Sequence, residues 1–171
     1  MKPGVTLIEL LVVIALFGII AGVGFPNLAG WNCKQEIRND FASVNNIFEQ
    51  ARDEAINRSR TVLVRTITNL PSDGATYRAF LLDNRNCNAS QSSQSLELFI
   101  PNVVISNKTQ LFGPSAQCFH SDGTATASQA VQQHQVRRTC SGIPITYQTF
   151  VFGATGLLDK QRRFKNAWVD L

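Results

Sequence analysis

Glu9 is the side chain whose position in the sequence most clearly calls for a chemical partner. Residues 5–25 form a run of twenty-one amino acids in which only Thr6 and Glu9 are polar. A carboxylate at the centre of a membrane helix costs about 2.5–3.5 kcal/mol, and it normally pairs with another group. The chemistry to expect at Glu9 is therefore a charge pair in a medium of low dielectric constant.

The four cysteines are the next candidates for covalent chemistry. Cys118 and Cys140 flank a segment that contains the turn sequence Asp122-Gly123, so they could face each other on neighbouring strands. That arrangement leaves Cys33 and Cys87 as the second pair. Four cysteines permit three connectivities, and we expect this one.

A metal site is the alternative use of these residues. A strand would place Cys118 and His120 on the same face, and His134 and Cys140 could complete a set of four ligands. No C-x-x-C spacing accompanies them, so we favour disulfides and expect no metal. Residues 129–135 form a glutamine-rich stretch that we interpret as a loop or an excursion at a sheet edge, and histidines near such loops are usually solvated.

The excess of positive charge lies in the C-terminal part of the chain. Residues 27–107 hold eight basic and eight acidic side chains, whereas residues 108–171 hold seven basic and three acidic ones. Cations around Phe164 would suit contacts with phosphates and stacked bases. The interpretation we favour is that Phe164 and Trp168 face the core of a closing strand, with the charges on its solvated face. The candidate DNA-binding cations are Lys160, Arg162, Arg163 and Lys165.

Catalytic motifs are not found in the sequence. It contains no nucleophile elbow, no H-E-x-x-H and no glycine-rich phosphate loop. Ser121-Asp122-Gly123 is typical of a turn rather than part of a catalytic triad. We therefore expect a protein that is not an enzyme and needs no cofactor.

A long N-terminal helix is the element that must position Glu9. Twenty-one apolar residues make a helix of about 31 Å, close to the thickness of the hydrocarbon core of a bilayer. After Pro26 the pattern becomes that of an amphipathic helix to about Arg58. We predict one helix, bent at Pro26, that packs on a sheet. Its apolar stripe comprises Ile37, Phe41, Val44, Phe48, Ala51 and Ala55.

The rest of the chain alternates short β-like runs with turn residues. The fold class predicted is α+β, with the long helix packed on an antiparallel β-sheet or β-sandwich. We expect a leader at 1–4, a transmembrane and assembly helix at 5–26, and a globular domain at 27–171, with its amphipathic helix at 27–59 and its β-rich part at 60–171. The predicted strands are residues 61–68, 77–82, 96–100, 103–105, 146–152 and 164–169, and the predicted turns are 71–74, 83–88, 113–114, 122–123, 141–142 and 153–156.

The N-terminal residues resemble a known class of leader. Gly4 followed by VTLIEL resembles the class III leader of type IV prepilins and pseudopilins. The resemblance implies that prepilin peptidase cleaves after Gly4, that Val5 is then N-methylated, and that Glu9 neutralises the amine of a neighbouring subunit. Pro26 matches the helix-kinking proline of that family. Lys2 before the apolar run favours a cytoplasmic N-terminus, so the domain would be periplasmic.

Two further segments resemble one subfamily. ARDEAINRSRTVLV and CFHSDGTATA are similar to segments of the H-type secretion pseudopilins and of the minor pilins FimT and FimU. This implies a single-pass protein of the bacterial inner membrane that later joins the tip or initiation complex of a type IV pilus, with the major pilin and other minor pilins as partners. The alternatives are an H-type pseudopilin of a type II secretion system and a DNA receptor pilin.

Overall fold

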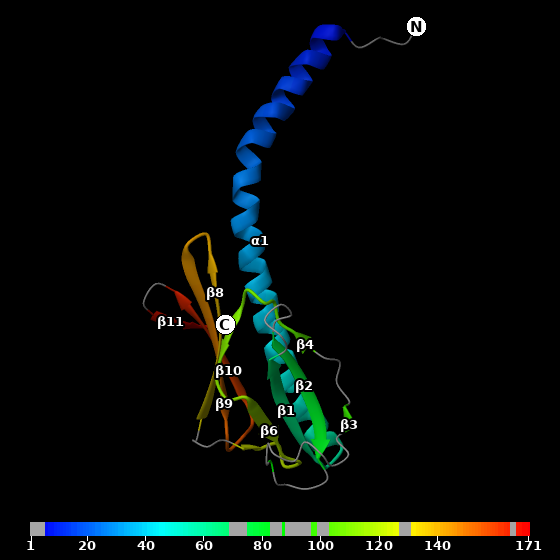
Figure 1. Ribbon diagram of the computed structural model, residues 1–171, viewed down its shortest axis with the longest axis vertical. Helices are drawn as coiled ribbons and strands as arrows, with labels where there is room; N and C mark the ends of the chain where they lie inside the picture. Colours follow the sequence, from blue (N-terminus) through cyan, green and yellow to red (C-terminus); the bar gives the residue numbers. More distant parts are fainter. Residues whose placement is uncertain are drawn as a thin grey trace.

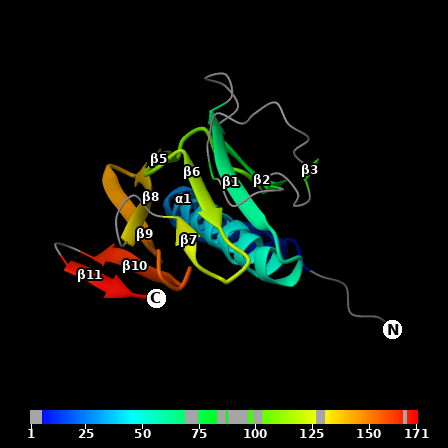
Figure 2. The same cartoon turned by 90° about the horizontal axis from the view of Figure 1, so that it is seen from below.

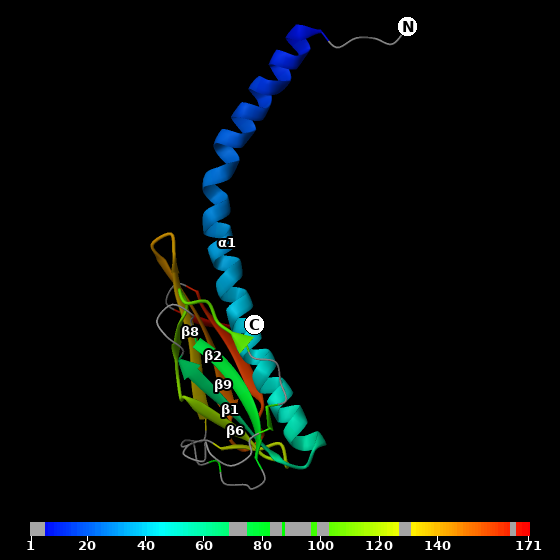
Figure 3. The ribbon, with the colours of Figure 1, turned by 45° about the vertical axis from the view of Figure 1, so that its right-hand side comes forward.

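A single long helix, α1 (Leu7–Asn57), dominates the computed structural model. The structure describes residues 6–68, 75–82, 87, 97–98, 103–126, 131–164 and 167–171. The helix is curved but continuous through position 26 (Figures 1 and 3), which confirms the prediction of one helix. The side chain of Pro26 lies outside the described residues.

The ends of α1 follow from local sequence. Thr6 is the N-cap, with extended backbone angles and a side chain that accepts a hydrogen bond from the Glu9 amide at 3.4 Å. Near the other end, Arg58 Nε donates to Glu54 Oε2 at 2.6 Å, an ion pair across one turn. Ser59 then takes a positive φ of 52°, and β1 begins two residues later.

Two antiparallel sheets account for the rest of the described chain. In the first sheet the order is β3-β2-β1-β6-β7, and β4 also pairs with β2. In the second the order is β11-β10-β9-β8-β5. The first sheet consists of β1 (Thr61–Thr68), β2 (Ala75–Leu82), β3 (Glu97–Leu98), β4 (Val103–Val104), β6 (Ala116–Phe119) and β7 (Ala125–Thr126). The second consists of β5 (Gln110–Phe112), β8 (Val131–Cys140), β9 (Ile143–Phe152), β10 (Leu158–Phe164) and β11 (Ala167–Asp170).

The C-terminal half of α1 contacts both sheets, and the main core lies between them and the helix. Seen along its length (Figure 2), α1 has β8–β11 on one side and β1 and β2 on the other. Phe48 joins the layers, because its ring lies 6.0 Å from Tyr77 and 6.2 Å from Phe119 of the first sheet and 4.7 Å from His134 of the second. The α+β class is confirmed, and the predicted helical stripe is buried.

Two predictions about strands were wrong. The predicted strand at 164–169 straddles a hairpin, because Phe164 ends β10 and Ala167 begins β11. The glutamine-rich stretch is not a loop, because residues 131–135 begin β8. The alternation in β8 is real, but its inward positions include His134 and Arg138, so a count of apolar residues misses it. The predicted turns at 71–74 and, apart from Cys87, at 83–88 lie outside the described residues.

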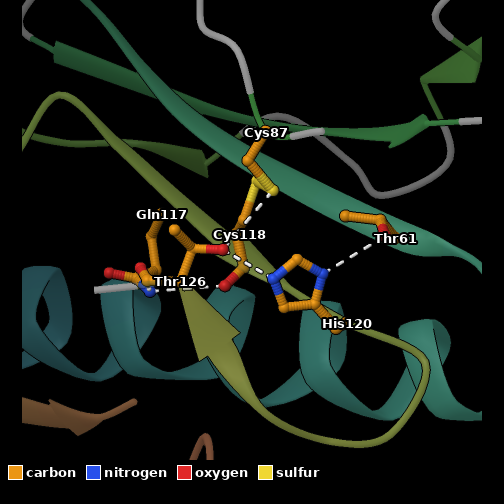
Figure 4. The surroundings of a disulfide bond; sticks show 6 residues. All are labelled: Thr61, Cys87, Gln117, Cys118, His120 and Thr126. Carbon is orange, nitrogen blue, oxygen red and sulfur yellow. Dashed lines mark hydrogen bonds between the residues drawn. A yellow bond between two sulfur atoms is a disulfide. The ribbon is translucent and has the colours of Figure 1, made fainter. Parts of the chain in front are cut away.

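The predicted disulfide pairing was also wrong. Cys33 of α1 pairs with Cys140 at the end of β8, and Cys87 pairs with Cys118 of β6. The prediction assumed that Cys118 and Cys140 lie on neighbouring strands, whereas β6 and β8 belong to different sheets. One bridge therefore fastens the helix to the second sheet, and the other lies at the first sheet (Figure 4).

Candidate assembly and binding surfaces

The N-terminal part of α1 is an apolar surface without a partner in the described chain. Eleven large apolar side chains between Leu7 and Ile20 are 44–78 % exposed. A helix that is apolar on all sides is normally buried in protein or lipid. Within the described part of the chain, no helix is long and apolar enough to cross a membrane. The exposed side chains are Leu7, Ile8, Leu10, Leu11, Val12, Val13, Ile14, Leu16, Phe17, Ile19 and Ile20.

Glu9 lies in the first turn of this helix. Thr6 and Glu9 have the T-x-x-E spacing of a capping box, and a negative charge here interacts favourably with the helix dipole. The carboxylate is exposed among apolar neighbours, so the geometry leaves it accessible to a cation on another molecule. Gly4 and Val5 lie outside the described residues.

The candidate DNA-binding cations among the described residues do not all line one hollow. Lys160 forms an ion pair with Glu49 of α1 at 2.6 Å, and the guanidinium of Arg162 lies 5.7 Å from the centre of the Tyr147 ring. Arg162 and Arg163 line the same hollow, and Lys160 does not. Lys165 lies outside the described residues.

The predicted core position of the two C-terminal aromatic residues was wrong. Phe164 is 57 % exposed and Trp168 is 38 % exposed. Both line a notch between the β8–β9 hairpin and the β10–β11 hairpin, which diverge in Figure 1 because β10 pairs with β9 only as far as Tyr147. The volume of the notch is about 720 Å³. Its lining residues are Lys34, Phe112, Gln135, Arg137, Ile143, Pro144, Ile145, Thr146, Arg162, Arg163, Phe164 and Trp168.

Only part of this notch could be predicted from the sequence. It marked Arg162, Arg163 and the two aromatic residues as a group, but not Lys34 of the helix or Phe112 of β5. These two are brought to the notch by the packing of α1 and β5 against β8. A pattern along one strand cannot predict such neighbours.

The cysteines and histidines of the alternative metal site are used in other ways. Cys118 and Cys140 belong to different disulfides, so their sulfurs are not thiolate ligands. His120 lies between two threonines, with Nδ1 at 3.4 Å from Thr61 Oγ1 and Nε2 at 2.5 Å from Thr126 Oγ1 (Figure 4). Among the described residues, no group of histidine, cysteine and carboxylate side chains could hold a metal ion.

His134 is buried, contrary to the prediction of a solvated side chain. It is 4 % exposed, and its Nε2 lies 3.5 Å from Gln117 Oε1. Burial lowers the pKa of His134 to about 4, so the ring is neutral at physiological pH. Tyr77 is also buried; burial raises the pKa of its phenol, and a hydrogen bond with Thr66 opposes that rise. Both side chains line a hollow of about 390 Å³ between the two sheets.

A polar cluster fastens α1 to the sheets beside the Cys33–Cys140 bridge. Arg138 of β8 is 6 % exposed and forms an ion pair with Glu36 of α1. One turn further on, Asp40 Oδ2 accepts a hydrogen bond from Thr109 Oγ1 at 2.5 Å. The helix is thus joined to the second sheet by a covalent bond and a charge pair, and to the residue just before β5 by a hydrogen bond.

Comparison with known protein families gives two matches to the chain. Residues 2–25 match the prokaryotic N-terminal methylation motif, which places the chain in the class of pilin-like proteins. Residues 42–156, more than half of the chain, match the type II transport protein GspH, and the chain belongs to that family. The two matches confirm the resemblance to GspH-like and FimT-like pilins that the sequence motifs indicated.

No curated protein matches the chain significantly. No solved structure does so either.

Proposed function

We propose that this chain is a non-catalytic minor pilin, similar to FimU or FimT, that joins the tip or initiation complex priming a type IV pilus. The observation that supports the proposal best is the exposed apolar surface of α1 from Leu7 to Ile20. Leaving this surface in water would be costly, at about 25 cal/mol per Å² of apolar area. The methylation motif at residues 2–25 includes the same segment, and this supports the proposal that the segment is processed and then buried in a filament.

In this proposal the same helix lies first in the inner membrane and then in the filament. Prepilin peptidase first removes residues 1–4, and residues 5–26 anchor the subunit as a single pass in the inner membrane, with residues 27–171 in the periplasm. The apolar side chains then exchange lipid for the helices of neighbouring pilins. Because they stay out of water throughout, the exchange does not lose the free energy of burial.

Glu9 would pair with the methylated amine of Val5 on a neighbouring subunit. At 4 Å, two opposite unit charges attract by about 4 kcal/mol in a medium with an effective dielectric constant near 20. The pair exists only after cleavage, because cleavage creates the amine. Pro26, which cannot donate a backbone hydrogen bond, would let the helix adjust between membrane and filament.

Substitutions of Glu9 test the assembly role. Glu9→Gln keeps the hydrogen-bonding side chain that a capping box accepts but removes the charge, whereas Glu9→Ala removes both. We expect both variants to accumulate normally in the membrane and to be depleted from sheared surface pili, as measured by immunoblotting. Wild-type incorporation of Glu9→Gln would mean that Glu9 acts as a helix cap and would refute the charge pair.

The second candidate is an H-type pseudopilin of a type II secretion system. The description of the matched family as type II transport proteins favours it directly. A deletion strain separates the two candidates. Loss of surface pili with normal protein secretion supports the minor pilin, and loss of secreted proteins from the medium with normal pili supports the pseudopilin.

A further inference from the structure

The notch between the β8–β9 and β10–β11 hairpins combines positive charge with exposed apolar side chains. Lys34, Arg137, Arg162 and Arg163 all line it, and none of its lining residues is acidic. The Nε atom of Arg162 is buried without a hydrogen-bond partner among the described residues. The ligand whose charge complements this surface is therefore an anion.

Six of the eight other lining residues are apolar. Ile143 is 63 % exposed and Phe164 is 57 % exposed, and Pro144 and Ile145 lie beside them in β9. Nucleic-acid bases can stack on Phe164 and Trp168, but the aliphatic side chains in β9 are better covered by the apolar side chains of a peptide. The anionic ligand that fits the notch is therefore an acidic peptide.

The edge of β9 that faces the notch adds a backbone contact. Residues 143–146 of β9 pair with β8, but β10 pairs with β9 only from Tyr147 onwards. Phe152 N donates to Leu157 O, and hydrogen-bonded and non-hydrogen-bonded pairs alternate in an antiparallel ladder, so the backbone groups of Thr146 point towards the notch. Among the described residues, no strand pairs with this part of the edge. An extended segment could satisfy these groups as an added strand.

We propose that this notch binds an acidic, extended segment of a neighbouring protein subunit, which adds a strand to the notch-facing edge of β9. The carboxylates of the segment pair with Arg137 and Arg163, and its apolar side chains cover Ile143 and Phe164. Only the source of the segment, a neighbour in the assembly, rests on the proposed function. The binding chemistry depends on the notch alone.

Fluorescence anisotropy with the purified full chain in detergent micelles tests the proposal. The probe is a short synthetic peptide of alternating glutamate and valine, compared with a peptide in which lysine replaces glutamate and with single-stranded oligothymidylate. Arg137→Ala/Arg163→Ala removes two exposed cations of the notch. Arg38→Ala/Lys108→Ala removes two exposed cations elsewhere and is the matched control for net charge.

We expect the acidic peptide to bind in preference to both comparison probes, and the notch variant to weaken binding by about tenfold or more while the control variant does not. Bound peptide should also slow hydrogen exchange at the amide of Thr146. Equal effects of the two variants, unchanged exchange, or tighter binding of the oligonucleotide would overturn the proposal. Since this assay involves neither processing nor a filament, its failure would leave the minor pilin proposal standing.

Discussion

His134 illustrates how burial, rather than residue type, decides the role of a side chain in this protein. The ring lies against Phe48 and Gln117 with no charged partner among the described residues, so the folded state favours the neutral form. In the unfolded chain His134 has its ordinary pKa of 6.5, whereas in the folded chain its pKa is about 4. The contribution of His134 to stability is therefore complete above pH 6.5 and is lost as the pH falls from 6.5 towards 4.

We predict that substitution of His134 reduces the acid sensitivity of the domain. The measurement uses a soluble fragment, residues 29–171, which lacks the exposed apolar part of α1. In the wild-type fragment, protonation of His134 in the unfolded state should lower the free energy of unfolding by up to about 3 kcal/mol between pH 7 and 4. His134→Gln cannot titrate, so its free energy of unfolding should fall less over this range, measured by urea denaturation at each pH. An identical slope in both proteins would show that carboxyl groups alone cause the acid sensitivity.

Gly156 and Gly142 allow two effects of glycine to be separated. Both have a positive φ, of 61° and 80° respectively. A Cβ at Gly156 would lie 2.2 Å from the carbonyl oxygen of Gly123, whereas a Cβ at Gly142 would meet nothing within 4 Å. Gly142→Ala should cost about 1–2 kcal/mol from backbone strain alone.

We predict that Gly156→Ala destabilises the domain more than Gly142→Ala does, because the Gly123 backbone must also move. The comparison requires the melting temperatures of the two variants of residues 29–171. Equal losses would mean that the Gly156 turn can move away from the Gly123 turn at no cost in free energy, although Arg52 Nε donates a hydrogen bond to a carbonyl oxygen in each of these two turns.

At the scale of elements, α1 is fastened to the second sheet by contacts that are distant in sequence. The Cys33–Cys140 bridge spans 107 residues and the Cys87–Cys118 bridge spans 31. A cross-link over a longer loop removes more conformational entropy from the unfolded chain. The first bridge therefore restricts the unfolded chain more than the second does, and it is the bridge that holds the helix against the second sheet.

We predict that loss of either bridge costs about 2–5 kcal/mol, and that Cys33→Ala/Cys140→Ala costs about 1 kcal/mol more than Cys87→Ala/Cys118→Ala. Urea denaturation of the two double variants measures the difference. Non-reducing peptide mapping of the wild type should recover both bridges as paired here. A Cys118–Cys140 peptide would contradict the pairing.

The sequence predicted the elements with strong periodicity and missed those that depend on distant neighbours. The apolar stripe from Ile37 to Ala55 predicted the buried face of α1, and the β-branched residues of β1 predicted that strand. The inward face of β8 contains His134 and Arg138, which contact Phe48 and Glu36 of α1 respectively. The disulfide pairing and the notch likewise depend on which sheet each strand joins, and local sequence does not specify this.

At the scale of the whole molecule, the chain is a long rod joined to a compact domain (Figure 3). The domain covers α1 from about Ile37 to Ala55, and no described residue covers the helix from Leu7 to Ile20. This asymmetry suits a subunit whose helix is buried by neighbours and whose domain faces outward. It is the physical basis for the proposed assembly role.

Mass spectrometry of the protein from its native cells tests the central claim most directly. We predict a mature chain that begins at N-methylated Val5 and has lost residues 1–4, recovered with sheared surface filaments. A Gly4 substitution should retain the leader and remain in the membrane fraction. A wild-type chain that still begins at Met1, or that is cleaved after the whole apolar segment, would contradict the account.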